Sequence, residues 1–515
     1  MTTVVRRATL STTEVAALCE PRTVLVAENA GAVEETEHAR IHTFSLDKGP
    51  FRSYERTIVV NDRGDGTAAV EQQVSFTLAA PYFGKLFLVP VRHEMAKLQV
   101  RRTSPFWAPN AVLDARAAAT LGALALLGLL TGYQGTLLTQ TISYAGDELG
   151  VGTNGQARAL AFARVDVVIA LTVTWLGDRY GRRRVLRLAL ASSCVLSSLG
   201  ALAPSIAGLV ILQIPARGLL AASGVLILVL AMEEVPATAR AWSTSVLALA
   251  AAMGPGLCIA LLFVADQGER AWRLLFLLPL AFTPIVIRAC RYIGESRRFQ
   301  RAHASVRGFA GHGHRLALLC IAGILGAIYT TPASQLRNEF LRDERGWSGA
   351  TISLFVLGTA TPGGLGVIAG GLSADRYGRR LIGAIGLVGG SIGTTLSFVL
   401  EGPGMWLSAL VGALMFGATV PALGVYGPEL FPTAMRAKAN GTLVATARIG
   451  SVIGLLTVGQ LSDTNSIGFG LAVCMTAPFI LAAMVLLFFP ETAGKELETI
   501  NPEDAPTIPS ATALM

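Results

Sequence analysis

The chain has 515 residues, of which 52% are apolar and only 15% are charged, a composition too apolar for a protein that meets water on all sides. Its net charge of +8 comes from arginines that cluster in short links between apolar runs. That distribution is typical of membrane proteins and argues against nucleic-acid binding. The six cysteines contain no C-x-x-C pair, so we expect no disulfide, metal site or cofactor.

The first 110 residues are polar and differ from the rest of the chain. A short helix is predicted near 14–18, four alternating segments predict strands, NDRGDG (61–66) predicts a hairpin turn, and 81–100 predicts a helix with an apolar face. This order resembles a truncated helix-grip fold, a lipid- and polyketide-binding fold. We therefore expect residues 1–110 to form a small cytoplasmic α+β domain that senses a ligand, docks on the membrane surface or aids assembly. The alternating segments are 23–29, 38–46, 54–60 and 69–78.

Long apolar runs follow from residue 117 onward. A bilayer core of about 30 Å needs roughly 20 apolar residues in a helix, and the sequence predicts twelve such spans in two sets of six. The protein is therefore expected to be an all-α membrane protein with twelve transmembrane helices after the small domain. The predicted spans are 117–138, 157–176, 185–203, 206–231, 241–264, 272–289, 316–335, 351–371, 382–400, 405–427, 440–461 and 467–489.

The links between these spans differ in charge. Arginines gather after the even-numbered spans, for example in 177–187 and 288–315, whereas 139–157, 401–406 and 462–469 contain no lysine or arginine. Positively charged links stay on the cytoplasmic side of a membrane. We therefore expect a multi-pass protein of the cell membrane with both termini in the cytoplasm.

The segment DRYGRR occurs twice, after the second and after the eighth span. Three pairs of similar segments share nearly one offset, which indicates a tandem duplication of a six-helix unit. The expected units are a first bundle at 115–289, a cytoplasmic linker at 290–315, a second bundle at 316–490 and a cytoplasmic tail at 491–515. The pairs are Asp178 with Asp375 (375 − 178 = 197), Arg240 with Arg436 (436 − 240 = 196) and Glu295 with Glu491 (491 − 295 = 196).

The pattern G-x-x-x-D-R-x-G-R-R around these repeats resembles the hallmark of the major facilitator superfamily. Other segments resemble its sugar-porter and general substrate-transporter branch, and the resemblance covers about residues 115–500. It implies two six-helix bundles and transport by alternating access. Gln134 stands where proton-coupled sugar porters carry an aspartate, and the seventh span lacks the hexose-binding pattern, so a sugar substrate is disfavoured. The other segments are EEVPATAR (233–240), GESRRF (294–299), PELFPTAMR (428–436) and PETAGKELETI (490–500).

An aspartate at the end of a helix can pair with arginines of the following link, and such contacts can hold one conformation and break in another. We predict that Asp178 with Arg182, and Asp375 with Arg379, act as conformational latches. The alternative is that these arginines only set the topology. The predicted partners of the latches are Glu234, Arg240, Glu295, Glu429, Arg436 and Glu491.

Four ionisable residues fall near the middle of predicted spans: Arg164, Asp166, Arg217 and Arg448. A charge in the bilayer core costs at least about 2.5–3.5 kcal/mol, so each needs a cavity or a partner. Asp166 is the one carboxylate among them and is the predicted proton carrier. Three arginines against one aspartate favour an anionic substrate, although Arg217 could be structural and Arg164 could extend to the interface.

Arg448 lies in ARIG, which resembles the G-R-x-G pattern of the aromatic-acid branch of the same superfamily, and a planar guanidinium can hold a carboxylate through two parallel bonds. Tyr133 and Gln134 in the first span and Tyr329 in the seventh are further predicted substrate contacts, because equivalent polar stripes favour a central cavity. Such residues also serve as hydrogen bonds between helices.

The sequence therefore predicts a secondary transporter, in the form of a monomeric proton symporter for a carboxylate or aromatic acid. No enzyme is expected, because no catalytic constellation stands out, and no P-loop supports an ATP-driven pump. The expected partners are the lipid bilayer, protons and a small anionic substrate, with no nucleic acid. The alternatives are a sugar or drug transporter of the same superfamily, or a ligand sensor that does not transport.

Overall fold

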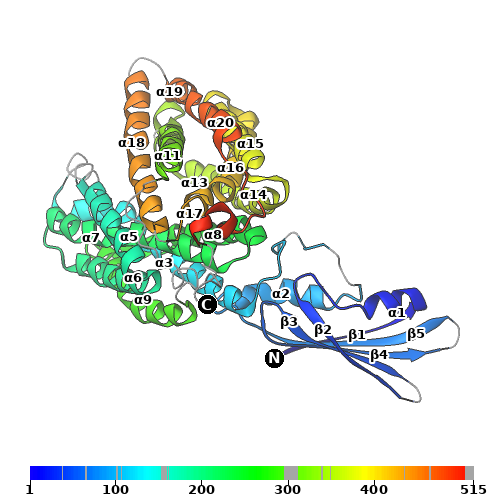
Figure 1. Ribbon diagram of the computed structural model, residues 1–515. Coiled ribbons are helices and arrows are strands. Elements are labelled where there is room, and N and C mark those ends of the chain that lie inside the picture. Colours follow the sequence, from blue (N-terminus) through cyan, green and yellow to red (C-terminus); the bar gives the residue numbers. More distant parts are fainter. Residues whose placement is uncertain are drawn as a thin grey trace, which may run out of the picture.

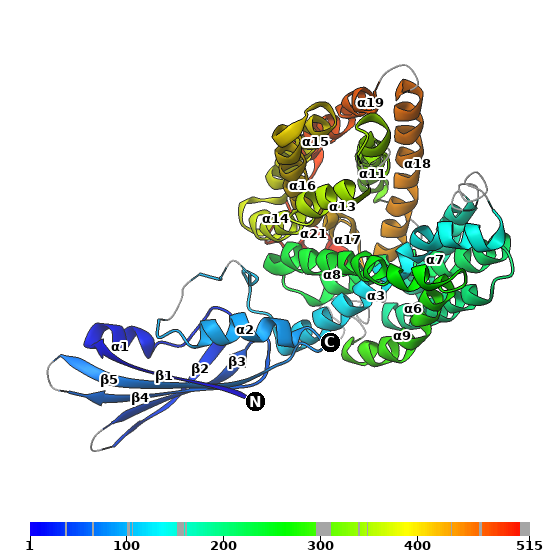
Figure 2. The same ribbon diagram turned by 180° about the vertical axis from the view of Figure 1, so that it is seen from behind.

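The computed structural model consists of a β-sheet unit beside a large helical bundle (Figure 1). The sheet and its two helices precede the helical bundle in the chain, and the same arrangement is seen from behind (Figure 2). The residues that the structure describes are 1–36, 39–63, 66–99, 103–105, 107–151, 159, 162–294, 311–337, 340–347, 349–433, 435–462 and 466–504.

The N-terminal unit is a five-stranded antiparallel sheet in the order β1-β5-β4-β3-β2. Helices α1 (Thr12–Leu18) and α2 (Gly84–Met95) cover one face of it, because their buried apolar side chains pack against alternate residues of β5. The strands are β1 (Thr2–Ser11), β2 (Ala27–Glu35), β3 (Arg40–Lys48), β4 (Phe51–Asp62) and β5 (Thr67–Leu78).

Strand β1 was not predicted. Its ten residues alternate poorly in polarity, and Val4 is the one residue of the strand that is fully buried. The strand forms because it pairs with β5 along its whole length, with Val4 opposite Val74. Long-range pairing of this kind leaves little local signal in the sequence.

The helical part contains eleven helices, within the described residues, that are long and apolar enough to span a membrane. They match eleven of the twelve predicted spans. The second predicted span, 157–176, lies partly outside the described residues, and its described part continues as α5 (Asp166–Tyr180).

The helices form two successive sets. The first half of the bundle contains α3 (Ala115–Leu149), α5, α6 (Arg182–Leu199), α7 (Ile206–Glu234), α8 (Arg240–Ala260) and α9 (Trp272–Tyr292). The second half contains α11 (Gly313–Gln335), α13 (Gly349–Ala360), α14 (Gly363–Tyr377), α15 (Arg379–Val399), α16 (Gly402–Gly424), α17 (Tyr426–Glu429), α18 (Arg436–Ser462), α19 (Ile467–Cys474) and α20 (Thr476–Phe488).

The two halves meet mainly along two helix pairs, α5 with α18 and α8 with α14, with smaller contacts of α8 with α16 and of α7 with α18. The predicted eighth span is divided into α13 and α14 by a break before Pro362, and the predicted twelfth span is divided into α19 and α20. A short helix, α21 (Leu497–Ile500), lies in the tail. The described part of this tail packs on the bundle through the buried Asn501.

Close contact between helices depends on small residues, as is usual in membranes. Where α18 crosses α11, a Cβ atom at Gly454 would lie 2.0 Å from the carbonyl oxygen of Ile328. Gly459, about one turn further along α18, has open space around its Cα. The two glycines therefore differ in packing although they share a helix.

We predict that Gly454→Ala destabilises the protein by about 1–3 kcal/mol, because the added methyl group forces the two helices apart. Gly459→Ala should be neutral or slightly stabilising, because alanine has the higher helix propensity. The measurement is the thermal unfolding midpoint of both variants in detergent. Equal midpoints for the two variants would contradict the close crossing.

Candidate functional site

Both copies of DRYGRR form the same sharp turn at the arginine-rich end of the bundle. Gly181 and Gly378 have φ values of 97° and 102°, a backbone conformation that side chains rarely adopt and glycine permits. The turn lets the first arginine of the next helix point back to the aspartate of the previous one. Arg182 lies 3.0 Å from Asp178, and Arg379 lies 3.3 Å from Asp375.

The carboxylate of Glu233, at the end of α7, joins the two halves. It accepts hydrogen bonds from Arg182 in the first half and from Arg436 in the second half. Arg182 also donates to the carbonyl oxygen of Thr433 in the second half. The side chains of Glu233, Arg182 and Arg436 are completely buried, so this contact excludes water.

Glu429 is the counterpart of Glu233 in the second half (429 − 233 = 196). It binds Arg379 of its own half, and Arg240 of the first half lies 3.4 Å away. Each half thus lends one arginine to the glutamate of the other half. We call the two groups together the latch: Asp178, Arg182, Glu233 and Arg436 in one, and Asp375, Arg379, Glu429 and Arg240 in the other.

The two aspartates of the latch also bind across the halves. Asp178 accepts a hydrogen bond of 2.7 Å from the backbone N–H of Lys438, at the start of α18. Asp375 accepts one of 3.2 Å from the N–H of Trp242, at the start of α8. A carboxylate at a helix N-terminus satisfies an unpaired N–H and the helix dipole, so each half caps a helix of the other.

The tail adds further contacts to the latch. Glu491 accepts hydrogen bonds from the backbone N–H groups of Arg379 (3.1 Å) and Arg380 (3.3 Å). Burial alone would raise the pKa of Glu491, but these bonds and one from Ala493 outweigh it and hold the pKa below its ordinary value. Arg379 also donates to the hydroxyl of Thr492. The carboxylate therefore caps α15 in its ionised form.

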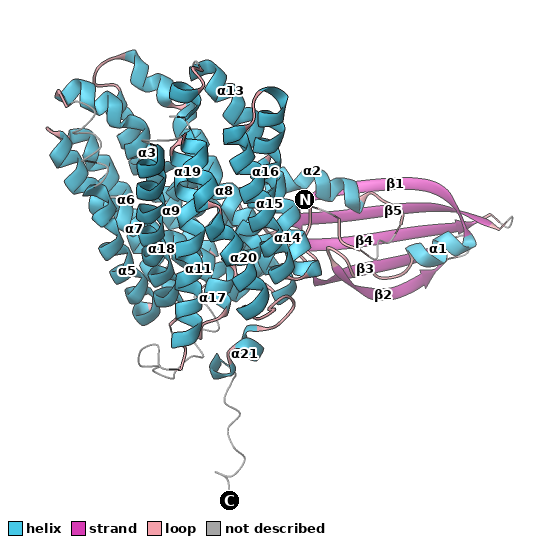
Figure 3. Cartoon of the chain, turned by 90° about the horizontal axis from the view of Figure 1, so that it is seen from above, coloured by secondary structure: helices cyan, strands magenta, loops and turns pink. Residues whose placement is uncertain are grey.

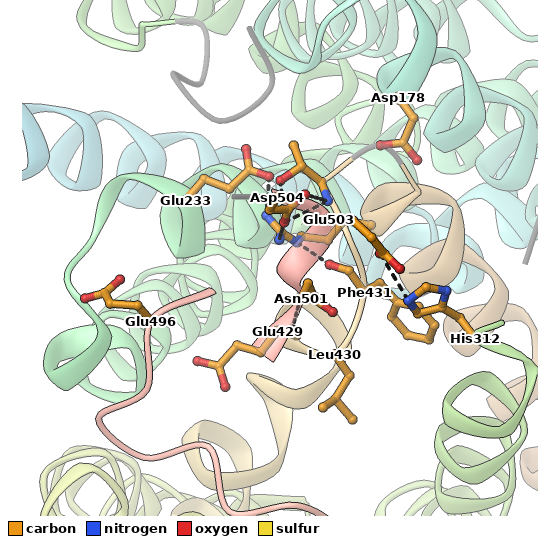
Figure 4. Close-up of polar contacts among 12 residues, drawn as sticks. Asp178, Glu233, His312, Glu429, Leu430, Phe431, Glu496, Asn501, Glu503 and Asp504 are labelled. Carbon is orange, nitrogen blue, oxygen red and sulfur yellow. Dashed lines mark hydrogen bonds and ion pairs between the residues drawn. The ribbon is translucent and has the colours of Figure 1, made fainter. Parts of the chain in front are cut away.

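Figure 4 shows how the end of the tail reaches the same network. Asp504 accepts hydrogen bonds from the N–H and the hydroxyl of Thr433 and lies 3.1 Å from Arg436. Asn501 donates to the carbonyl oxygen of Glu429. The tail thus contacts both groups of the latch.

Glu234, one of the predicted latch partners, forms an ion pair with Arg116, at 3.0 Å, within the first half. Its neighbour Glu233 binds the latch arginines, which the offset of 196 from Glu429 could have revealed. Glu295 lies outside the described residues.

A second charged cluster lies deeper in the bundle. Asp166 is 2% exposed, and its carboxylate lies 3.5 Å from Arg217 and 3.4 Å from Arg448. Arg217 also donates to the carbonyl oxygen of Gly135 at 3.1 Å. Asp166 precedes Asp178 by twelve positions, about 18 Å along a helix, which places the cluster near mid-span. We call these three residues the central triad.

The central triad joins the two halves, because Asp166 and Arg217 belong to α5 and α7 whereas Arg448 belongs to α18. The Arg448 side chain is 32% exposed, against 2% for the side chain of Asp166. One arginine is therefore accessible to a solute while it holds a buried carboxylate. The side chain of Arg164 lies outside the described part of the chain.

The other predicted substrate contacts are buried between helices. Tyr133 is fully buried and donates to the carbonyl oxygen of Leu275 in α9. Tyr329 is fully buried and donates to the carbonyl oxygen of Ser391 in α15. Gln134 is 1% exposed and lies next to α6. These positions favour packing roles, each within one half.

Comparison with known proteins agrees with this architecture. Residues 316–513 match the sequence model of the Major Facilitator Superfamily. The cis,cis-muconate transport protein of Acinetobacter baylyi is 33% identical over 154 residues, 30% of this chain and 37% of that relative. The probable 4-methylmuconolactone transporter of Cupriavidus pinatubonensis is 26% identical over 366 residues, 65% of this chain and 83% of that relative.

A solved structure of the proton:xylose symporter XylE has a similar fold, with a TM-score of 0.64 and 18% identity over 75% of this chain and 99% of that one. The match to the Major Facilitator Superfamily model covers the second half of the bundle. The two relatives are transporters by name. The muconate relative is matched over little more than a third of its length, so the substrate is a matter for proposal.

We predict that Glu233→Gln separates the arginine-rich ends of the two halves, because both Arg182 and Arg436 lose a charged partner. Spin labels on the exposed residues Tyr180 and Tyr377, one in each half, report the separation by double electron–electron resonance. The variant should gain a population at longer distance.

Glu234→Gln is the matched control, because it removes the neighbouring charge but breaks a contact within one half. It should leave the distance distribution unchanged. A longer distance in both variants, or in neither, would show that Glu233 does not hold the halves together.

Proposed function

We propose that this protein is a secondary active transporter that moves a small organic anion, a carboxylate or aromatic acid, together with protons. The central triad is the observation that carries this proposal. It places two guanidinium groups around one carboxylate near mid-span and draws them from both halves. Alternating access requires a site that both halves share.

The charge balance of the triad supports an anionic substrate. With Asp166 ionised, two arginines leave one positive charge in excess, which a carboxylate would neutralise. Arg448 is the accessible arginine, and its planar fork can hold a carboxylate through two parallel bonds. An incoming carboxylate would therefore compete with Asp166 for Arg448.

This competition supports coupling to protons. When Arg448 turns to a substrate, Asp166 keeps only Arg217 within the triad and remains buried. A buried carboxylate with fewer cations is stabilised by taking up a proton. Substrate binding and proton binding would then favour each other, which is the requirement for symport.

The latch supports the conformational part of the proposal. The arginine-rich end is cytoplasmic by the positive-inside rule, so both termini would lie in the cytoplasm and the protein in the cell membrane. In this proposal the latch closes the cytoplasmic end, and the transport cycle would open it. All triad residues come from one chain, so a monomer would be sufficient.

The names of the relatives agree with an organic anion, because muconate carries carboxylates and a muconolactone transporter matches over most of its length. The likeness to the xylose symporter concerns the fold alone. The latch and the central triad consist of residues of this chain. A sugar would leave the excess positive charge of the triad without a partner.

We predict that Arg448→Gln abolishes recognition of carboxylates. At a hundred times its Kd, a ligand stabilises the native protein by about 2.7 kcal/mol, which is visible as a shift of the thermal unfolding midpoint. Muconate or benzoate should shift the wild type but not the variant, and glucose should shift neither. Uptake into proteoliposomes should fall in parallel.

Arg376→Gln is the control, because Arg376 lies outside the triad and contacts the ring of Tyr377. It should keep the carboxylate response. A sugar response that Arg448→Gln leaves intact would exclude the anion proposal, and ligand binding without any uptake would favour a sensor.

We further predict that Asp166→Asn uncouples transport from protons. The variant cannot take up the proton that compensates the loss of Arg448, so a pH gradient should no longer drive accumulation, while exchange of labelled for unlabelled carboxylate persists. Glu401→Gln, at a carboxylate that is 80% exposed, should keep gradient-driven uptake. Normal accumulation by Asp166→Asn would assign the proton to another group.

A further inference from the structure

The N-terminal unit contacts the bundle through the start of α2. Pro81 packs on Gly122 of α3, where an added Cβ atom would lie 3.1 Å from the Pro81 carbonyl oxygen. The ring of Tyr82 lies 6.1 Å from that of Tyr292, the last residue of α9. Both contacts lie toward the arginine-rich end of membrane-spanning helices, and Figure 3 shows α2 beside the bundle with the sheet extending away from it.

The exposed side of α2 combines apolar and basic side chains. Leu86 and Val89 are 67% and 73% exposed, and Tyr82, which lies just before the helix, is 44% exposed. Lys85 and Arg92 are exposed on the same side as Leu86 and Val89. Their spacing of three or four positions makes one stripe on a helix. No acidic residue occurs between positions 82 and 93.

A cavity of about 360 Å³ lies where α2 meets the bundle. Among the described residues that line it, none is charged. Its one hydroxyl, on Ser245, is already engaged with the carbonyl oxygens of Ala241 and Val367. The cavity therefore suits a hydrocarbon and not the proposed anionic substrate. Its walls include Leu78, Phe87 and Trp107 on one side and Leu121, Leu249 and Ile368 on the other.

The cavity borders the surface of the bundle that a bilayer would cover. Leu86 and Met253 both line it, and they are 67% and 53% exposed. Met253 belongs to the candidate membrane span Ala237–Cys258, so an exposed side chain there faces lipid. The stripe on α2 thus continues directly into the lipid-facing surface.

We propose that α2 is an interfacial helix that lies in the surface of an anionic bilayer, with an acyl chain of a phospholipid in the cavity. Large apolar side chains enter the boundary of headgroups and acyl chains, while lysine and arginine attract anionic headgroups. The N-terminal unit is then held on the membrane beside the transporter and does not move freely in water.

The position of the cavity gives this lipid a second contact. Leu249 belongs to α8 of the first half and Ile368 to α14 of the second half. An acyl chain in the cavity would therefore touch α8 and α14, one of the helix pairs at which the halves meet. It would respond to their relative movement.

The first test places spin labels on the full chain in vesicles of phosphatidylglycerol and phosphatidylcholine, on a background with Cys19 and Cys320 replaced by serine. Leu86→Cys reports the stripe. Val33→Cys is the control, because Val33 is 51% exposed on β2 of the same unit. Relaxation by oxygen, which concentrates in lipid, should be severalfold stronger at position 86 than at 33, and relaxation by a water-soluble nickel complex should be weaker. Equal behaviour at both positions would overturn the interfacial helix.

The second test concerns the cavity. Lipids brominated on their acyl chains quench tryptophan fluorescence on contact, and Trp107 lines the cavity. Wild type should lose a larger fraction of its fluorescence in brominated vesicles than Trp107→Phe does. Equal quenching in the two proteins would show that no acyl chain enters. Lys85→Glu with Arg92→Glu should abolish any preference of these signals for phosphatidylglycerol, and a preference that persists would overturn the role of the basic side chains.

Discussion

The exchange of arginines between Glu233 and Glu429 is the constraint on which the arrangement of the two halves depends. Both carboxylates are completely buried, and each binds one arginine from each half. Removing one member of a buried ion pair typically costs about 3–5 kcal/mol, because the other charge is left without compensation. The halves therefore separate at this end only if water enters and solvates all of these groups together, which makes the contact a two-state element.

The same helices carry the latch and the central triad. Helix α5 bears Asp166 and Asp178, α7 bears Arg217 and Glu233, and α18 bears Arg436 and Arg448. The two sites are about 18–24 Å apart along these helices, and a helix in a packed bundle moves largely as a rigid body. A change in the contact between Asp166 and Arg448 would therefore alter the angle between α5 and α18, and with it the latch. The central triad is thereby coupled to the latch through α5 and α18.

The repeat, the spans and the two aspartates of the latch could be predicted from the sequence, because apolar length and a constant offset are local signals. The choice between Glu233 and Glu234 could not be made from the motif alone, since adjacent residues on a helix point about 100° apart. The offset of 196 from Glu429 and the contact of Glu233 with Arg436 of the second half decide between them. Strand β1 and the contact of Asp504 with Arg436 depend on partners 56 or more positions away. The pairing of Asp166 with Arg448 spans 282 positions.

The duplication applies to the latch but not to the central triad. Every member of the latch has a counterpart of the same type in the other half. The triad has none: the offset of 197 in α5 places Gly363 opposite Asp166, and the offset of 196 places Ala413 and Ala252 opposite Arg217 and Arg448. A gate that must close by bringing two halves together profits from symmetry, because each half caps the other. A site that binds one asymmetric solute gains nothing from symmetry, and both arginines of the triad contact the same carboxylate. We infer that the symmetric contacts of the latch serve the conformational change, and that the asymmetric central triad determines the substrate.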